Sequence, residues 1–462
     1  MGQTPSIVCV GGGVTGIIAA KLINTHGANI KIIEKEESCG GLWSSVSRTL
    51  GNTRLTFDNG LRLAVGTGEA ELDQKIFDDL DDVDWVRIKG YPKEGHIFNQ
   101  VLYSENSCID ARQLGKELLA SGLDELLSRV PDPVTKSNLA DQLVAEYGPT
   151  FTKHIFNPVM KRFTGEDLDR LAPTSHRGII PRRLIVADHD ETLKFLMDRP
   201  HENRIAHTTT KDLMSNATKE FLYPKQGGIG RWVQGLIRSL DKNTVKFHTG
   251  TNITNITHSD GYVRSLCLET GDSIEVDAVI WTLAPELFYK LLGEKPKYAA
   301  PVFMHVLLVH AVFDKPFNTN LHYISNYDPN GVFHRAVIYP NITGHDGQTK
   351  YYHLSLEVIV DPRETNIDKL KNAAIAELEQ YRIISSQKDL IQIETNLIKN
   401  IYPVVLAKNW VPSLELKAHL QTKFTNVAWI GRSGGEGLFL DSIVKEANNS
   451  AVNLLNQLNM EI

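Results

Sequence analysis

Cysteine is scarce in this chain of 462 residues. The four cysteines, Cys9, Cys39, Cys108 and Cys267, show no CxxC spacing, so neither a disulfide framework nor a cysteine metal motif is indicated. Free thiols in a reducing compartment are the simplest interpretation. We therefore expect a cytoplasmic protein.

Long apolar runs are also missing. The longest, Val302 to Phe313, contains His305 and His310 and is shorter than the roughly 20 residues of a membrane-spanning helix. Met1 to Pro5 carries no charged segment followed by an apolar core, which a secretory signal would require. We expect no transmembrane segment.

A long basic run is a third absence. The formal net charge is −6, and lysines and arginines alternate with acids, which gives no indication of nucleic-acid binding. No HExxH motif and no Walker loop occur. His305 and His310 lie five apart in an expected strand and so face opposite sides, and Asp188 to Asp190 is expected to be a solvated loop. The sequence thus predicts no metal site.

Glycine is concentrated at the first strand and helix. Ser6 to Gly16 reads Ser-Ile-Val-Cys-Val-Gly-Gly-Gly-Val-Thr-Gly, an apolar strand, a glycine turn and a helix start. Gly11 permits the tight turn, Gly13 allows a phosphate to approach the backbone, and Gly16 allows close packing of helix on strand. The N–H groups at Val14 and Thr15 then face the anion. This order predicts a dinucleotide site.

Glu34 ends the second expected strand, Asn29 to Ile33. From there a carboxylate can accept hydrogen bonds from a ribose hydroxyl. The alternative is an ordinary strand–helix–strand turn in which Glu34 is merely solvated.

The segment after Glu34 is not one that a simple dehydrogenase requires. It reads Lys35-Glu36-Glu37-Ser38-Cys39-Gly40-Gly41-Leu42-Trp43-Ser44, an acidic cluster followed by two glycines and an apolar residue. This pattern resembles the flavoprotein superfamily of amine oxidases, protoporphyrinogen oxidases, phytoene desaturases and UDP-galactopyranose mutases. The resemblance implies FAD as the cofactor, held in part by Lys35, Gly41 and Leu42, with NADPH or NADH as a reductant where one is needed.

The end of the chain repeats the strand–glycine–helix order. Val427 to Arg432 is an expected strand, three residues from Ser433 to Gly435 follow, and Asp441 is expected to cap a helix from Ser442 to Leu455. The resemblance implies that this unit returns to the same FAD. It adds four residues to the cofactor site: Gly431, Arg432, Leu440 and Asp441. It also places the backbone of Ile253 at the adenine.

The fold class implied is α/β, with a discontinuous Rossmann-type FAD-binding domain and a second, α+β substrate domain. Segments 1–105, 223–300 and 401–462 are assigned to the FAD-binding domain. Segment 106–222 is a mostly helical insert of the substrate domain, and 301–400 is its antiparallel sheet.

Hydrophobic periodicity predicts the individual elements. Helices are expected at Glu69–Leu80, Ala111–Ala120, Asn138–Tyr147, Leu193–Met197 and Lys369–Tyr381. Strands are expected at Trp85–Ile88, Ile97–Tyr103, Thr244–His248, Asn252–Thr257, Val263–Leu268, Ala278–Thr282, Val302–Val312, Val332–Tyr339 and Tyr351–Val360, with a hairpin tip at His345–Gly347.

Within the superfamily, Gly431-Arg432 favours the UDP-galactopyranose mutase-like branch, because oxidases commonly have an acid after this glycine. Ile180-Pro181-Arg182-Arg183 resembles the mutase loop in which an arginine binds the substrate diphosphate. The resemblance assigns that role to Arg183, with Arg182 beside it, and Tyr402 is the tyrosine we nominate for a substrate phosphate or sugar hydroxyl. Arg432 would stabilise negative charge on reduced FAD or bind substrate.

Two departures weigh against the mutase branch. The mutases carry a histidine-bearing G-P-H-x-F-H loop under the flavin, whereas this chain has Gly60-Leu61-Arg62-Leu63-Ala64-Val65. Their paired tyrosines after Gly-Arg are replaced by Glu436-Gly437-Leu438-Phe439.

Three functions stay open on these grounds. The first is an FAD-dependent oxidoreductase of the amine oxidase-like superfamily, with flavin N5 as its reactive centre and Arg432 and Arg183 as catalytic candidates. The second is a UDP-galactopyranose mutase-like isomerase that uses reduced FAD on a nucleotide sugar. The third is a non-catalytic scaffold in which FAD is structural. The expected partner is a small-molecule substrate.

Overall fold

The fold is taken from a computed structural model, which describes residues 5–129, 134–197, 203–209, 220–296, 298–299, 301–344 and 350–460. The expected hairpin tip at His345–Gly347 lies outside these residues.

A parallel five-stranded sheet forms one half of the molecule. Its order is β12-β2-β1-β16-β22, and every neighbouring pair is parallel. The strands are β1 (Ser6–Val10), β2 (Asn29–Ile33), β12 (Val245–His248), β16 (Ala278–Trp281) and β22 (Val427–Trp429). Segments from both ends of the chain and its middle therefore share one sheet, which confirms the discontinuous Rossmann-type fold.

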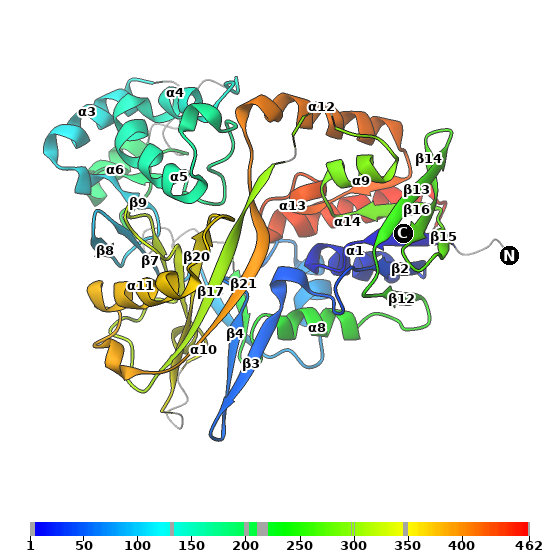
Figure 1. The fold of residues 1–462 in the computed structure, drawn as a ribbon, viewed down its shortest axis with the longest axis horizontal. Helices are drawn as coiled ribbons and strands as arrows, with labels where there is room; N and C mark the ends of the chain where they lie inside the picture. The colour runs from blue at the N-terminus through cyan, green and yellow to red at the C-terminus, as the bar shows by residue number, and fades with distance from the viewer. Residues whose placement is uncertain are drawn as a thin grey trace.

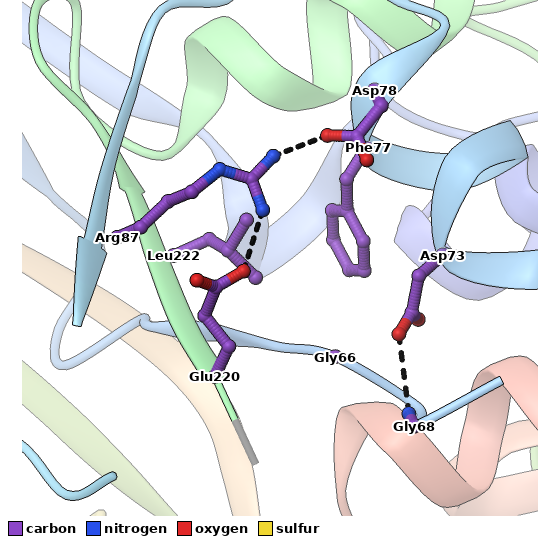
Figure 2. Close-up of a pocket in the computed structure, with 8 residues that line it drawn as sticks. All are labelled: Gly66, Gly68, Asp73, Phe77, Asp78, Arg87, Glu220 and Leu222. Carbon is purple, nitrogen blue, oxygen red and sulfur yellow. Dashed lines mark hydrogen bonds and ion pairs between the residues drawn. The ribbon is translucent and has the colours of Figure 1, made fainter. Parts of the chain in front are cut away.

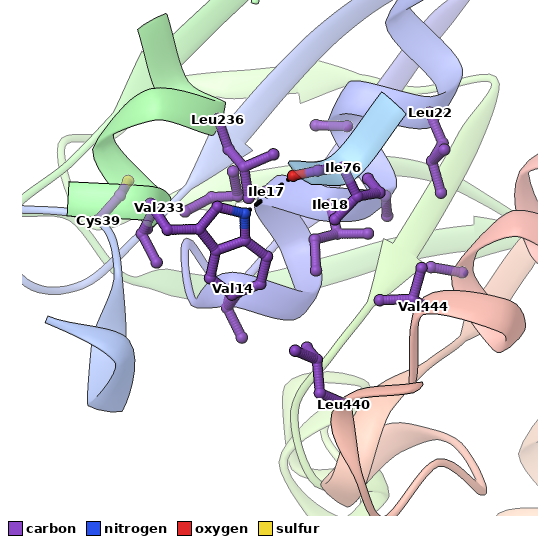
Figure 3. Close-up of a cluster of buried hydrophobic side chains, with 14 of the residues drawn as sticks. Val14, Ile17, Ile18, Leu22, Cys39, Ile76, Val233, Leu236, Leu440 and Val444 are labelled. Atoms are coloured by element: carbon purple, nitrogen blue, oxygen red, sulfur yellow. Dashed lines mark hydrogen bonds between the residues drawn. The ribbon is translucent and has the colours of Figure 1, made fainter. Parts of the chain in front are cut away.

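One face of this sheet is covered by α1 (Val14–Asn24), α8 (Gly230–Arg238) and α14 (Leu440–Gln457), whose apolar side chains share one core. In Figure 3, Ile17 and Ile18 of α1 lie between side chains of α8 and α14. The opposite face packs on a small antiparallel sheet of β13 (Ile253–Ser259), β14 (Tyr262–Leu268) and β15 (Ser273–Glu275), and on α9 (Pro285–Leu291). Burial on both faces explains why β1 and β16 are almost entirely apolar.

The second half is built on a seven-stranded sheet of order β21-β17-β20-β19-β18-β7-β8. All pairs are antiparallel except β18 with β7. The strands are β7 (Glu94–Phe98), β8 (Val101–Tyr103), β17 (Val302–Phe313), β18 (Tyr323–Asn326), β19 (Arg335–Ile338), β20 (Tyr352–Val360) and β21 (Leu390–Val404). Two helices accompany it, α10 (Tyr339–Thr343) and α11 (Ile367–Gln380).

The helical insert lies at one end of this sheet (Figure 1). It contains α3 (Lys116–Leu127), α4 (Leu139–Phe151), α5 (Asn157–Thr164) and α6 (His189–Leu196), with the short pair β9 (Ile109–Asp110) and β10 (Leu184–Ile185). β17 and β21 run side by side as long ribbons between this insert and the opposite end of the molecule (Figure 1). The expected mostly helical insert is therefore present.

Smaller elements complete the chain. β3 (Ser45–Leu50) and β4 (Thr53–Asp58) form a hairpin, and β5 (Ala64–Val65), β6 (Trp85–Lys89) and β11 (Glu220–Pro224) form a three-stranded sheet. α2 (Ala70–Asp73) continues as a π-helical turn over Gln74–Asp78, and α12 (Ala407–Lys423) and the short α13 (Gly431–Gly434) precede α14. The five segment boundaries stay a prediction, and β7 and β8, which precede residue 106, pair in the seven-stranded sheet.

Two expected elements near residue 100 are divided in the structure. Ile97–Tyr103 was expected as one strand but spans parts of β7 and β8, because Asn99 and Gln100 both adopt positive φ and reverse the chain. The expected helix Ala111–Ala120 is broken at Gly115, whose φ is 89°. Only a 3₁₀ turn precedes this glycine, and α3 follows it.

Two expected termini are also wrong. Asp188 to Asp190 is exposed, but it opens α6 rather than a loop, since the Asp188 carboxylate accepts a hydrogen bond from Glu191 N at 3.0 Å. α14 begins at Leu440 with Phe439 as its N-cap residue, so Asp441 lies inside the first turn and does not cap the helix. Ser442 makes the capping contact to the Phe439 backbone.

Within the described part of the chain, no helix has the length and apolar character needed to cross a membrane. All four cysteines are free. No grouping of His, Cys, Asp and Glu suited to a metal ion occurs among the described residues.

Candidate functional site

The glycine turn after β1 has the geometry that its sequence predicts. Gly11 has a φ of 103°, which favours glycine, and a Cβ atom there would clash with the Thr282 hydroxyl. A Cβ atom at Gly16 would clash with the Gly11 carbonyl oxygen, so Gly16 allows α1 to pack on the turn. Nothing lies within 4 Å of the Cβ position of Gly13. The turn is thus tightly packed on the protein side and open at Gly13.

α1 begins at this open position. Gly13 is its N-cap residue, and no side chain caps the helix. The backbone N–H groups of Val14 and Thr15 in the first turn are therefore available to an anion, and the helix dipole favours negative charge there.

Glu34 stabilises the same turn through hydrogen bonds. Its carboxylate oxygens accept hydrogen bonds from Gly12 N at 2.8 Å and from Glu36 N at 2.9 Å. Each oxygen retains a second lone pair for a ribose hydroxyl. Lys35 is exposed and pairs with Glu36 at 3.3 Å, so its cofactor role stays a prediction.

The segment with Gly41 and Leu42 lies beside the turn. Gly40 N donates to Gly12 O at 2.8 Å, and a Cβ at Gly41 would lie 3.5 Å from Gly13 Cα. At the expected adenine end, Thr251 N donates to Glu34 O at 3.2 Å, two residues before Ile253. The buried Thr251 hydroxyl has no hydrogen-bond partner among the described residues, and a ligand can supply one.

The C-terminal glycine unit meets the first one directly. Gly431 has a φ of 83°, and a Cβ there would lie 2.8 Å from Thr15 Cγ2 at the start of α1. Glu446 of α14 holds the loop by accepting hydrogen bonds from Gly431 N at 2.7 Å and Glu436 N at 2.6 Å. Leu440 is buried in the core beneath. Sequence reasoning brought Gly431 to this site but missed Glu446.

A small pocket of about 10 Å³, roughly the space that one water molecule needs, lies between the two halves of the molecule. Segments near the glycine turn contribute Leu42, Asn59 and Arg62, and the seven-stranded sheet contributes five more residues. Those five are Val306, Glu357, Ile398, Ile401 and Tyr402. This pocket brings Leu42 and Tyr402 together, and their expected cofactor and substrate roles stay predictions.

Positive charge gathers around this pocket. Burial lowers the pKa of Arg432, the charge of Arg62 lowers it further, and Arg335 acts in the same direction, against an opposing effect of Tyr402. The Arg432 side chain is exposed to solvent, although many protein groups lie close to it. Arg62 and Arg335 each lower the pKa of Arg432, so an anionic ligand beside Arg432 would relieve this repulsion.

Glu357 and Tyr402 partly offset the charge of Arg335. Burial alone lowers the Arg335 pKa, but Tyr402 and the Glu357 carboxylate outweigh burial and raise it. Glu357 Oε2 lies 4.0 Å from the Arg335 guanidinium, and Glu357 Oε1 accepts from Leu61 N at 2.5 Å. Glu357 therefore joins the Arg62 loop to Arg335.

The segment just before the arginine loop contacts this cluster through its backbone. Arg335 donates to Gly178 O at 3.2 Å, a few residues before Arg182 and Arg183. The Arg182 side chain is exposed and that of Arg183 is half-buried, and the Arg182 carbonyl accepts from the Tyr147 hydroxyl. The substrate roles of Arg182 and Arg183 stay predictions.

A larger cavity of about 190 Å³ lies elsewhere, between α2 and the sheet of β5, β11 and β6. Figure 2 shows Arg87 joined to Asp78 and Glu220 across it, and Asp73 joined to Gly68. Its polar groups are thus engaged with one another, and it contains none of the residues of the glycine turns. The smaller pocket at Arg62 is the better candidate site.

Comparisons with known proteins agree on the fold. The family described as NAD(P)-binding Rossmann-like domain matches residues 9–80. Reduced UDP-galactopyranose mutase is similar with a TM-score of 0.73 at 18% identity, over 99% of this chain and 95% of that one. No curated protein sequence matches the chain.

Two further solved structures are similar. Putrescine oxidase bound to putrescine has a TM-score of 0.58 at 12% identity, covering 98% of this chain and 99% of that one. An oxidoreductase from Methanosarcina mazei has a TM-score of 0.57 at 12% identity, covering 98% and 100%. The chain therefore shares its fold with UDP-galactopyranose mutase and putrescine oxidase, as the sequence resemblance implied.

Proposed function

We propose that this chain is an FAD-dependent oxidoreductase whose small substrate carries an anionic group. The coarse part of this proposal, FAD-dependent chemistry, is supported by the fold and by a turn that fits a dinucleotide. The finer part is carried by the arginines near the pocket: Arg62 lines it, Arg335 lies 4.0 Å from the pocket residue Glu357, and Arg432 is near enough to both for them to lower its pKa.

The residues present fit FAD at several points. The open Cβ position of Gly13 and the uncapped N–H groups of Val14 and Thr15 suit the pyrophosphate, since they combine close approach with a favourable dipole. Further along the cofactor, Glu34 suits a ribose. The resemblance adds Gly11, Gly16, Lys35, Gly41, Leu42, Ile253, Gly431, Arg432, Leu440 and Asp441.

When bound, FAD accepts a hydride from a substrate C–H bond. The chain's own residues bind and orient the substrate. Arg432, Arg62 and Arg335 provide charge-assisted hydrogen bonds to an anion, and Tyr402 presents a hydroxyl at the same wall. Glu357 fixes the Arg62 loop and Arg335 relative to one another.

The cofactor is tested by the visible spectrum of the purified protein, followed anaerobically as NADPH is added. Flavin bands support the proposal, and their bleaching identifies NADPH as a reductant. A colourless protein that gains no flavin bands on incubation with FAD would overturn the proposal. Flavin bands that respond neither to NADPH nor to any amine or hydroxyl substrate would favour the scaffold alternative.

The anion site is tested with inorganic pyrophosphate as the probe, by titration calorimetry on the FAD-loaded protein. Arg432→Ala and Arg62→Ala are each expected to weaken binding about tenfold or more, because hydrogen bonds to charged groups contribute roughly 1.5–3 kcal/mol. Arg264→Ala, an exposed arginine of β14 that does not line the pocket, serves as the control. Wild-type affinity in both site variants would remove the anionic group from the proposal.

A mutase-like isomerase is the second candidate. It is favoured by the TM-score of 0.73 to UDP-galactopyranose mutase over nearly the whole chain and by the contact of Arg335 with Gly178, a few residues before the arginine loop. Such an enzyme needs prior reduction and then converts a nucleotide sugar with no net redox change. Product analysis of reduced protein incubated with UDP-galactopyranose separates it from an oxidoreductase.

Arg183 gives this second candidate its own test. If Arg183 binds the diphosphate, Arg183→Ala should weaken UDP-galactopyranose binding about tenfold, whereas Arg177→Ala, an exposed arginine six residues earlier in the same loop region, should not. Equal affinities for both variants and the wild type would count against the mutase-like role.

A further inference from the structure

Asn59 presents an amide to the wall of the pocket between the two halves. It follows Asp58, the last residue of β4, and its backbone N donates to Ser44 O at 3.3 Å. Its side-chain Nδ2 donates to Ser44 Oγ at 2.8 Å. Both contacts hold Asn59 against the segment that follows Gly41 and Leu42.

The donor and acceptor roles of the Ser44 hydroxyl fix the orientation of this amide. Ser44 Oγ has one hydrogen, which it donates to Gly41 O at 2.8 Å. Toward Asn59 the same oxygen can then only accept, so the group facing Ser44 is the NH₂ and not the carbonyl. The carbonyl oxygen Oδ1 must face the other way.

Oδ1 is buried, and no donor among the described residues reaches it. Leaving a buried acceptor without a partner costs roughly 1–3 kcal/mol, so such atoms usually mark a missing ligand or water. The nearby side chains Arg62 and Tyr402 belong to the same pocket. Arg62 instead donates to the Leu61 carbonyl at 2.7 Å.

We propose that Asn59 is a ligand-recognition residue whose Oδ1 accepts a hydrogen bond from an N–H or O–H group of the molecule bound in this pocket. The bound molecule thus offers a donor to Asn59 as well as negative charge to the arginines. The donor belongs to the flavin ring or to the substrate. The inference rests on the proposed function, which places FAD beside Leu42 and an anionic group beside the arginines.

The test uses Asn59→Ala in the full chain, with the exposed Asn449→Ala of α14 as the control. The FAD dissociation constant and the visible spectrum are measured without substrate. The dissociation constants of UDP-galactose and of UDP, which lacks the sugar hydroxyls, are measured separately. Loss of one hydrogen bond of about 1 kcal/mol corresponds to about fivefold weaker binding.

A flavin donor predicts that Asn59→Ala shifts the flavin bands and weakens FAD binding about fivefold. A substrate donor predicts an unchanged spectrum and about fivefold weaker UDP-galactose binding, with UDP unaffected. Asn59→Asp, which keeps an oxygen acceptor, should rescue whichever effect occurs. If Asn59→Ala fails to fold, Ser44→Ala, which releases the amide, should give the same change in smaller measure.

Wild-type values in every assay would mean that Oδ1 accepts a hydrogen bond only from water, which would contradict the inference. A protein that binds no FAD at all would overturn the proposed function, while the UDP-galactose and UDP titrations would still measure the role of Asn59.

Discussion

At the scale of single residues, two glycines in one turn differ in what surrounds them. Gly16 is enclosed, since a Cβ atom there would clash with the Gly11 carbonyl oxygen and lie 2.9 Å from Cys9 Sγ. Gly13 has an ordinary φ of −70° and open space at its Cβ position. The fold requires a glycine at position 16, whereas nothing in the fold requires one at position 13. A ligand explains why a glycine stands at position 13.

Gly16→Ala is therefore expected to destabilise the protein, by about 1–3 kcal/mol, as overpacked sites usually do. Thermal or urea unfolding without added FAD measures this loss. Gly13→Ala is expected to cost less than about 1 kcal/mol, because alanine is only a poorer N-cap residue.

Gly13→Ala should nevertheless weaken FAD binding about tenfold or more, since its methyl group occupies the space that the pyrophosphate needs. Fluorescence titration of the apoprotein with FAD measures this effect. A Gly13→Ala protein with wild-type FAD affinity would contradict the cradle assigned to this turn.

At the scale of elements, the loop between β22 and α14 is held by one carboxylate. Glu446 accepts hydrogen bonds from Gly431 N, Glu436 N and Gly437 N at 2.7, 2.6 and 3.3 Å. Lys417 of α12 adds contacts to Gly435 O and to Glu436. The loop that carries Arg432 is thus fixed from two helices.

Glu446→Ala is expected to lower the free energy of unfolding by about 1.5–3 kcal/mol, because it leaves three backbone donors without a charged acceptor. Hydrogen exchange of residues 431–437 should speed up at the same time. Glu415→Ala, an exposed acid on α12, is the control. Unchanged exchange in this loop would show that Glu446 does not hold it.

The sequence could predict elements whose pattern is local. β1, the glycine turn and α1 follow from one continuous stretch of sequence. β16 and β22 each follow from an apolar stretch of their own. β21 escaped prediction, because an edge strand that alternates Gln392, Glu394 and Asn396 with apolar residues has no continuous apolar run. Strand pairing with β17, not local pattern, defines it.

The residues of the candidate site also divide into those that a local motif predicts and those that only the folded structure brings together. The residues around Gly11 and Gly431 could be predicted, since each lies in a recognisable motif. Arg62, Arg335 and Glu357 could not, because they come from three distant segments and meet only after the two halves pack together. Glu446 likewise lies 15 positions from its partner Gly431.

At the scale of the whole molecule, burial of titratable groups sets the response to acid. Five buried histidines have a lowered pKa, chiefly because of burial: those of His96, His176, His310 and His322 fall to about 4, and that of His334 falls well below its ordinary value. Three carboxyls act oppositely. Burial raises the pKa of Asp58 to about 6 and that of Glu94 to about 7, and it also raises that of Glu377.

Between pH 6.5 and 4 these histidines are protonated in the unfolded protein but stay neutral in the folded protein. The histidines therefore lower the stability of the folded protein as the pH falls. The folded carboxyls bind protons before the unfolded ones do, so they raise stability as the pH falls. The five histidines outnumber the three carboxyls. Near pH 5 unfolding is thus expected to take up roughly two protons, which corresponds to about 2.7 kcal/mol per pH unit.

Urea unfolding between pH 7 and pH 5 measures this slope, with stability expected to decrease steadily toward acid. His310→Gln removes one of the five buried histidines and can still accept from Ser355, whose Oγ lies 2.8 Å from His310 Nδ1. The slope of this variant should therefore fall by about one proton. His419→Gln, on the exposed face of α12, should leave the slope unchanged. Equal slopes for both variants and the wild type would show that His310 is charged in the folded protein at pH 5, because only a histidine with the same protonation in both states drops out of the balance.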